Sequence, residues 1–224
     1  MCTFNSSCLS ELGKDILNVI RKEDRKKVFG DQLGSPRAVG DAVELYLKTK
    51  GLKDLLFEKY GISLDENFGR RHMADMAFKD SNDGVYFVDV KTHNIATDFN
   101  MPNLTSVKRL EDFYETDGNN HFCVLLVSYF YSKEKNLFDE KQISCSFNLI
   151  ESFDWSCLTL GALGWGQIQI ANANNICYCE NTDRKKWMNE LCEKVSVFYD
   201  KEIGKIEKRK KLFAVAKEYW GKNF

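Results

Sequence analysis

The segment between Met73 and Thr92 constrains the fold most, because it predicts two strands joined by a tight turn. Met73–Lys79 is expected to form the first strand and Val85–Thr92 the second. The sequence Ser81-Asn82-Asp83-Gly84 lies between them, and its Asp-Gly pair is a typical β-hairpin signal. The chain is therefore expected to contain a sheet of which this hairpin is a part.

Helical and strand patterns alternate around the hairpin. Apolar residues at helical spacing, a capping residue and glycine breaks predict five helices, and apolar or alternating runs predict further strands. The helices are Leu9–Arg25, Pro36–Lys50, Leu52–Tyr60, Asn103–Glu115 and a long C-terminal helix from a Thr182 cap to about Tyr219; the strands are His121–Ser132, Gln142–Leu149 and Gly166–Ala171. This order predicts an α/β or α+β fold with a mixed central β-sheet flanked by helices.

Length and composition favour one soluble domain over residues 1–224. The chain has only two prolines and no Pro/Gly/Ser-rich stretch that would act as a linker. Its longest apolar run, Phe122–Val127, has the length of a buried strand and is too short to span a membrane. The N-terminus lacks the pattern of a secretory signal. We therefore expect a cytoplasmic protein with no membrane partner.

The eight cysteines are expected to be reduced and mostly buried. Most are scattered singly, and Cys177 and Cys179 are spaced C-x-C without a matching Cys/His pair, which argues against zinc. The net charge of −1 gives no bulk sign of a nucleic-acid partner. Three basic clusters, Arg21–Lys27, Arg184–Lys186 and Lys205–Lys211, could be DNA-facing patches, although each alone is more typical of a solvated helix face.

The second hairpin strand carries the residues with the clearest chemistry. Side chains alternate between the faces of a strand, so Asp89 and Lys91 share one face, and pairing through the turn brings Asp75 close to Asp89. Two neighbouring carboxylates repel each other unless a cation joins them, and hard oxygen ligands suit Mg²⁺. A lone D-x-K pattern is more often a surface salt bridge. Asp75 on the preceding strand, and Glu44 within GDAVEL upstream, favour a metal-dependent nuclease site.

The arrangement of Glu44, Asp75 and Asp89-Val90-Lys91 resembles the motif of the PD-(D/E)xK nuclease superfamily, in which type II restriction endonucleases are common. Further segments in the same order are similar to a restriction endonuclease of that superfamily. They are AVGDAVELYL (Ala38–Leu47), MADMAF (Met73–Phe78), VDVKTHNI (Val88–Ile95), MPN (Met101–Asn103), GQIQI (Gly166–Ile170) and DRKKW (Asp183–Trp187).

The resemblance implies a homodimeric, Mg²⁺-dependent endonuclease of the bacterial cytoplasm. It would cut both strands of double-stranded DNA at a short palindrome and leave blunt ends with 5'-phosphates. Carried over by position, Asp75 and Asp89 are the metal ligands and Lys91 is the catalytic lysine. Glu44 would be a helix residue that supports the site through Lys91 or through water.

The resemblance also implies that the loop after the catalytic strand reaches the DNA. That loop is His93–Asn103. Asn100 falls where a wedging glutamine is found, and Asn103 falls on a DNA-contacting asparagine. The other candidates for DNA contact are Thr92 at the end of the strand, and His93 and Asn94 at the start of the loop. Gln167 and Gln169 share one strand face, and their amides suit adenine contacts. The chain departs from the pattern at Gly161, where an asparagine reads bases, so the recognition sequence stays open.

The sequence is also compatible with two other functions. A nuclease of the same superfamily could act in repair or junction cleavage, and a DNA-binding module could keep the fold without the chemistry. The completeness of Asp75, Asp89 and Lys91 argues against the second reading, because binding alone does not need all three. A Cys-rich metal-binding protein is a more distant alternative.

Overall fold

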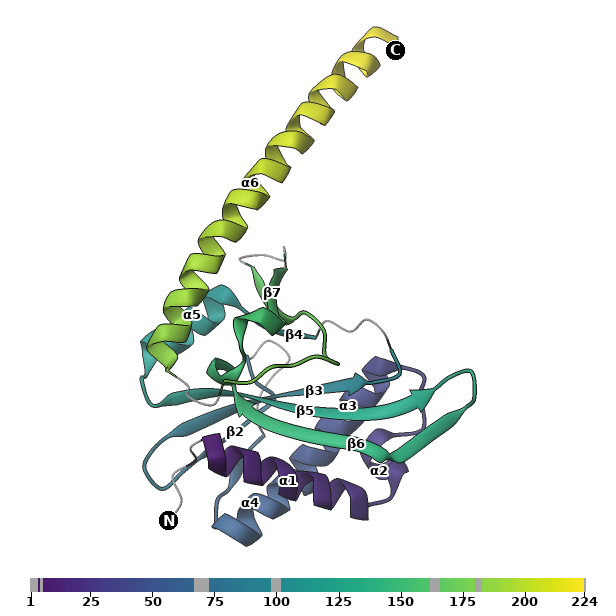
Figure 1. Cartoon of the computed structure of the whole chain (residues 1–224), viewed down its shortest axis with the longest axis vertical. Helices are drawn as coiled ribbons and strands as arrows, with labels where there is room; N and C mark the ends of the chain where they lie inside the picture. Colours follow the sequence, from purple (N-terminus) through teal and green to yellow (C-terminus); the bar gives the residue numbers. More distant parts are fainter. Residues whose placement is uncertain are drawn as a thin grey trace.

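The computed structural model of the chain describes Phe4 and residues 6–66, 73–97, 102–161, 166–179 and 183–223. Its centre is a five-stranded sheet in the order β1-β2-β3-β5-β6 (Figure 1). The strands are β1 (Leu64–Asp65), β2 (Met76–Lys79), β3 (Val85–Asn94), β5 (Asn120–Ser132) and β6 (Leu137–Leu149). β3 and β5 run parallel and the other neighbours run antiparallel, so the predicted mixed sheet is confirmed.

The predicted hairpin forms between β2 and β3. Met76 lies opposite Val88, and Lys79 lies opposite Val85. The buried carboxylate of Asp80 holds the turn. It accepts hydrogen bonds from the backbone N–H groups of Asn82 and Gly84 and from the hydroxyl of Tyr86. Asp83 adopts φ of 65°, a left-handed conformation that Asp tolerates in turns. The turn therefore fixes the register of the strand that carries Asp89 and Lys91.

Helices from the N-terminal part cover one face of the sheet. They are α1 (Ser6–Lys22), α2 (Arg25–Phe29), α3 (Pro36–Tyr46), a π-helical turn η1 (Leu47–Gly51) and α4 (Leu52–Tyr60). The helix predicted over Leu9–Arg25 ends earlier than expected. Asp24 accepts a hydrogen bond from the backbone N–H of Lys26 and so starts a second helix.

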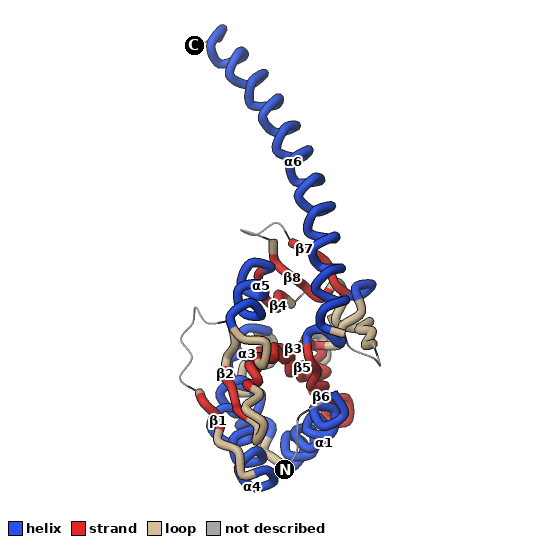
Figure 2. The backbone as a smooth tube through the Cα atoms, turned by 90° about the vertical axis from the view of Figure 1, so that its left-hand side faces the viewer, coloured by secondary structure: helices blue, strands red, loops and turns tan. Residues whose placement is uncertain are grey.

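The other face of the sheet carries α5 (Val107–Thr116) and a second, three-stranded sheet in the order β4-β8-β7 (Figure 2). Its strands are β4 (Asn103–Ser106), β7 (Leu158–Gly161) and β8 (Gln167–Ile170), and the short turns η2 (Ile150–Ser152) and η3 (Trp155–Cys157) precede β7. The prediction of a helix from Asn103 was wrong for its first four residues, because Asn103–Ser106 pairs with β8.

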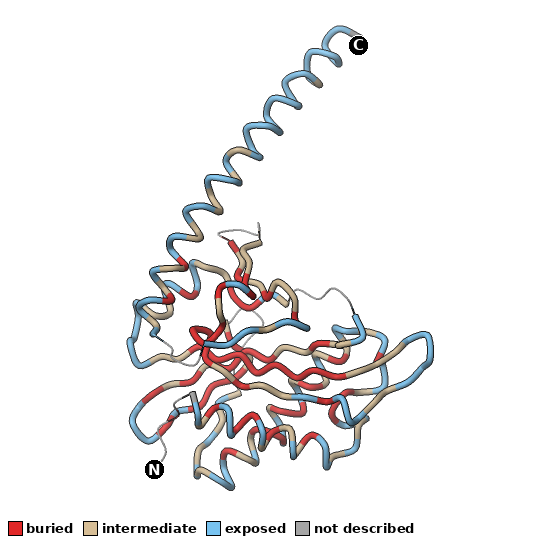
Figure 3. The backbone as a smooth tube through the Cα atoms, in the orientation of Figure 1, coloured by how far each residue is buried: buried red, intermediate tan, exposed pale blue. Residues whose placement is uncertain are grey.

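Strand β5 lies between two hydrophobic cores. Cys123, Leu125 and Val127 belong to the core under the N-terminal helices, whereas Phe122 and Val124 belong to the core under α5 and the small sheet. The apolar run that the sequence shows here is buried on both faces, as in Figure 3. The two cores are therefore separated by the central sheet.

The long C-terminal helix α6 (Arg184–Asn223) is anchored along its first part. Trp187 and Leu191 are buried in the second core, Val195 packs against it, and the outer part of the helix runs away from the two sheets (Figures 1 and 3). The predicted cap, Thr182, lies outside the described residues. None of the helices in the described part of the chain is long and apolar enough to cross a membrane.

The cysteine prediction was partly wrong. The seven cysteines within the described residues are free thiols, but only Cys123 and Cys157 are buried. Cys177, Cys179 and Cys192 are exposed, because they lie in the loop after β8 and on the outer side of α6.

Candidate active site

The two faces of β3 divide as the alternation predicted. Tyr86, Val88 and Val90 are buried in the core under the N-terminal helices. Phe87 packs against the second core, so Asp89 and Lys91, two and four residues further along, lie on that side of the strand. The candidate catalytic groups therefore face the side on which the small sheet lies.

Asp75 is fixed to β3 on both sides of Asp89. Its backbone N–H donates to the carbonyl oxygen of Val88 at 2.9 Å. Its carboxylate accepts from the backbone N–H of Val90 at 2.7 Å. These two bonds hold the carboxylate beside Asp89, as the hairpin pairing predicted.

Asp89 is a buried carboxylate with an incomplete set of partners. Lys91 Nζ donates to Oδ1 of Asp89 at 2.6 Å, whereas Oδ2 is buried and accepts no hydrogen bond from the residues that the structure describes. Burial raises the pKa of Asp89 to about 7; the Lys91 cation opposes this rise and the Asp75 carboxylate adds to it. Burial likewise raises the pKa of Asp75. When Asp75 and Asp89 are both ionised, the single charge of Lys91 does not offset their two negative charges.

Glu44 and Lys48 complete this group of charges from the helical side. Glu44 on α3 accepts a hydrogen bond at 2.5 Å from Lys48, so of the two routes that the resemblance implied, through Lys91 or through water, the direct bond to Lys91 is not formed. Burial raises the pKa of Asp75 most, and the hydrogen bond from Val90 lowers it. The negative charge of Glu44 is the third cause, and it raises the pKa. Lys48 was not identified from the sequence, although its position four residues after Glu44 on a helix is the usual spacing of such a pair.

The residues present fit a Mg²⁺ ion held mainly by two carboxylates. Within the described ranges, no three Cys, His, Asp or Glu side chains lie close enough together to hold a metal by themselves. Mg²⁺ commonly uses one or two carboxylates and takes its other ligands from water and substrate phosphate. The unpaired Oδ2 of Asp89, beside the carboxylate of Asp75, is the donor set such an ion needs.

The end of β3 is held by internal hydrogen bonds. His93 is buried, and its Nε2 lies 2.8 Å from Oδ1 of Asn174. The amide of Asn94 donates to the carbonyl of Tyr131 and accepts from the backbone N–H of the same residue. A direct DNA contact from His93 or Asn94 would require these bonds to break. Thr92 is half-buried, and its hydroxyl lies beside Gly40.

The small sheet brings several of the predicted DNA-contacting residues onto one face. Asn103 lies opposite Gln169, whose amide donates a hydrogen bond to Oδ1 of Asn103. Gln167 shares that face and lies opposite Gly161. A Cβ atom at Gly161 would lie 2.6 Å from Oε1 of Gln169, so the missing side chain there leaves room for this amide. We call these residues the amide face.

Two further residues of the amide face were missed by the sequence. Thr159 on β7 lies opposite Gln169, and Ser106 on β4 lies opposite Gln167. The residues next to Thr159 and Ser106 in the sequence do not indicate this position, because only the pairing of β7 and β4 with β8 brings them together. Asn100, the residue predicted to wedge into the bases, lies outside the described residues.

The basic clusters differ in what their side chains contact. Arg184 is internal: it donates to the buried Glu151 at 3.1 Å and to His121, and its guanidinium lies over the Tyr114 ring. Arg21 donates to the carbonyl of Ile143. These two arginines therefore serve the fold, whereas the cluster Lys205–Lys211 lies on the exposed part of α6.

No protein-family model matches this sequence, and no curated protein matches it.

Proposed function

We propose that this protein is a Mg²⁺-dependent endonuclease of the type II restriction class, which hydrolyses both strands of double-stranded DNA. The observation that carries the proposal is the Asp75–Asp89 pair. One buried oxygen of Asp89 has no hydrogen-bond partner in the described part of the chain, burial raises the pKa of both carboxyls, and Lys91 lies directly beside them. A protein gains nothing in stability from such an arrangement, so a bound cation is its natural explanation.

The residues of the site would divide the work. Asp75 and Asp89 would hold the ion, and the ion, when bound, polarises a phosphate and lowers the pKa of a water molecule. Lys91 would then be released from its bond to Asp89, so its ammonium group could orient the attacking water and offset the charge on the phosphate. Lys48 keeps the charge of Glu44 balanced, and this pair would tune the field at Asp75.

The amide face is the candidate surface for reading the sequence of the DNA. Side-chain amides can make paired hydrogen bonds to adenine in the major groove. Gln167, Gln169 and Asn103 present such amides together on an outer sheet face. A palindromic site would match a homodimer in which two copies present this face to the two half-sites.

The test is to incubate the purified protein with a plasmid of known sequence, with Mg²⁺ or with EDTA. Discrete fragments that require Mg²⁺, with blunt ends and 5'-phosphates, support the proposal, and the ends define the site. Asp75→Asn should abolish the fragments. Asp83→Asn is the matched control, because the same change is made at an exposed position of the same hairpin. A smear, cleavage of junctions alone, or DNA binding without cleavage would overturn this proposal.

A further inference from the structure

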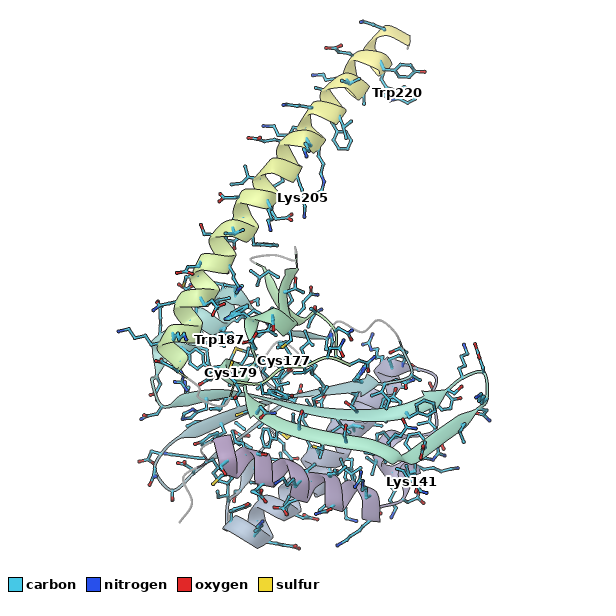
Figure 4. All side chains as sticks on the ribbon, in the orientation of Figure 1. Lys141, Cys177, Cys179, Trp187, Lys205 and Trp220 are labelled. Carbon is cyan, nitrogen blue, oxygen red and sulfur yellow. The ribbon has the colours of Figure 1, made fainter. Side chains whose placement is uncertain are left out.

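The outer part of α6 carries an unusual density of exposed apolar side chains. Beyond the anchored start, they are Ile203 (55% exposed), Ile206 (51%), Leu212 (70%), Phe213 (75%), Val215 (67%), Tyr219 (58%) and Trp220 (57%). Figure 4 shows Lys205 midway along the helix and Trp220 near its free end, both far from Trp187 at the anchored base. We call residues 203–223 the arm. Helices in proteins gain most of their stability from packing, so an arm of this composition needs a partner surface.

The spacing on the arm is that of a helix that packs against another helix. Ile203, Ile206, Phe213 and Trp220 are separated by three, seven and seven residues. These are the a and d positions of a heptad repeat, and they form one seam along the helix. Lys210 and Lys217 occupy the two intervening seam positions, where their long stems can lie along apolar neighbours while their charges reach water.

The charges of α6 set the direction in which a second copy can pack. Residues 208–223 contain six basic side chains and one acidic, a net charge of +5, whereas residues 193–207 contain three basic and four acidic, a net charge of −1. Parallel pairing would place the two +5 segments against each other. Antiparallel pairing places each +5 segment against the slightly acidic segment of the other copy.

A groove at the base of α6 offers a place for the end of such a partner helix. It has a volume of about 620 Å³ and lies between α6 and strand β7. Its apolar lining comes from Trp155, Leu158 and Leu160 on one side and Val197 and Phe198 on the other. The groove also carries charges of both signs, Glu193 and Glu202 beside Lys194, Lys201 and Lys205, so it is its apolar floor that suits an apolar helix end.

We propose that the arm is a dimerisation element, and that two copies of this chain pair their α6 helices antiparallel, each arm end lying along the groove at the base of the other. This extends the homodimer of the proposed function, but it depends on neither metal nor cleavage. A failed nuclease assay would therefore leave it intact, and its own failure would leave the metal site intact.

The first measurement is the solution mass of the full chain without DNA or metal. Sedimentation equilibrium at micromolar concentrations should give twice the 25.9 kDa of one chain. Phe213→Glu, alone and combined with Ile206→Glu, should raise the dissociation constant at least tenfold and lower the helix signal in circular dichroism. Phe57→Glu on α4 is the matched control, because Phe57 is 66% exposed and lies outside α6; it should keep the dimer.

The second measurement tests direction. A photo-reactive benzoylphenylalanine in place of Phe213 should cross-link to residues 193–207 of the second copy, as identified by mass spectrometry of the joined peptides. Cross-links to residues 208–223 would overturn the antiparallel arrangement. A wild-type chain that sediments as a monomer, or an arm variant that dimerises as well as wild type, would overturn the proposal. Loss of DNA binding by arm variants of a monomeric chain would assign the arm to DNA instead.

Discussion

Replacing Asp89 with Asn should make the metal-free protein more stable while destroying its site. The pKa of this carboxyl is raised from 3.8 to about 7, mainly by burial. In the folded state it therefore holds its proton over a pH range in which the unfolded chain has released it. A raised pKa contributes stability that is complete below about pH 4 and is lost as pH rises toward about pH 7.

The magnitude follows from the size of the pKa shift. Each pKa unit corresponds to about 1.4 kcal/mol, so a shift of roughly 3 units costs the wild type about 4 kcal/mol by neutral pH. Asn is nearly isosteric and never ionises. The stability gap in favour of Asp89→Asn should therefore open by about 1.4 kcal/mol per pH unit between about pH 4 and pH 7.

Urea denaturation in EDTA at several pH values measures this gap. Mg²⁺ should narrow it, because binding to the folded wild type adds stability that the variant cannot gain. Asp83→Asn is the control: Lys79 lowers the pKa of Asp83 from 3.8, so the gap for this variant should change only below about pH 4, with the opposite sign, and stay constant between pH 4 and pH 7. A gap for Asp89→Asn that does not change with pH would refute the electrostatic account of the site.

Three further variants test other parts of the structure. Lys91→Ala should lower the cleavage rate by roughly 10²–10⁴-fold, as for loss of a group that assists proton transfer, and leave DNA binding in a gel-shift assay largely intact. Cleavage near the wild-type rate would mean that the lysine is misassigned. Arg184→Ala should cost about 3–5 kcal/mol in urea denaturation, because it leaves the buried Glu151 carboxylate without its cation, and a loss below about 1 kcal/mol would contradict this role. Gly161→Ala should change the set of sites cut in a plasmid with little loss of stability, because its Cβ displaces the flexible end of Gln169; an unchanged fragment pattern would remove that amide from recognition.

The sequence predicted the β2–β3 hairpin because its signals are local. Strand alternation placed Asp89 and Lys91 on one face, and the Asp-Gly turn placed Asp75 beside them. The parts that it missed depend on distant pairing. Asn103–Ser106 precedes a helical pattern in the chain, and only its pairing with β8, more than sixty residues later, makes it a strand.

Other differences have equally specific causes. Strand β6 begins at Leu137 and not at Gln142, because three consecutive charged residues, Asp139–Lys141, interrupt the apolar alternation after Phe138. Lys48 was not assigned to the site because nothing in a helical pattern indicates which of its charges face a distant hairpin. The internal role of Arg184 was hidden for the same reason: Glu151, its buried partner, lies 33 residues away in the chain.

The separation of the two cores has a consequence for how such a protein can change over generations. Val88 and Val90 anchor the hairpin in one core, whereas Ile168 and Ile170 anchor β8 in the other. The outward residues of β8 contribute to neither, so selection can exchange them one at a time without a loss of folding. The amide face can therefore vary while the β2–β3 hairpin keeps its structure.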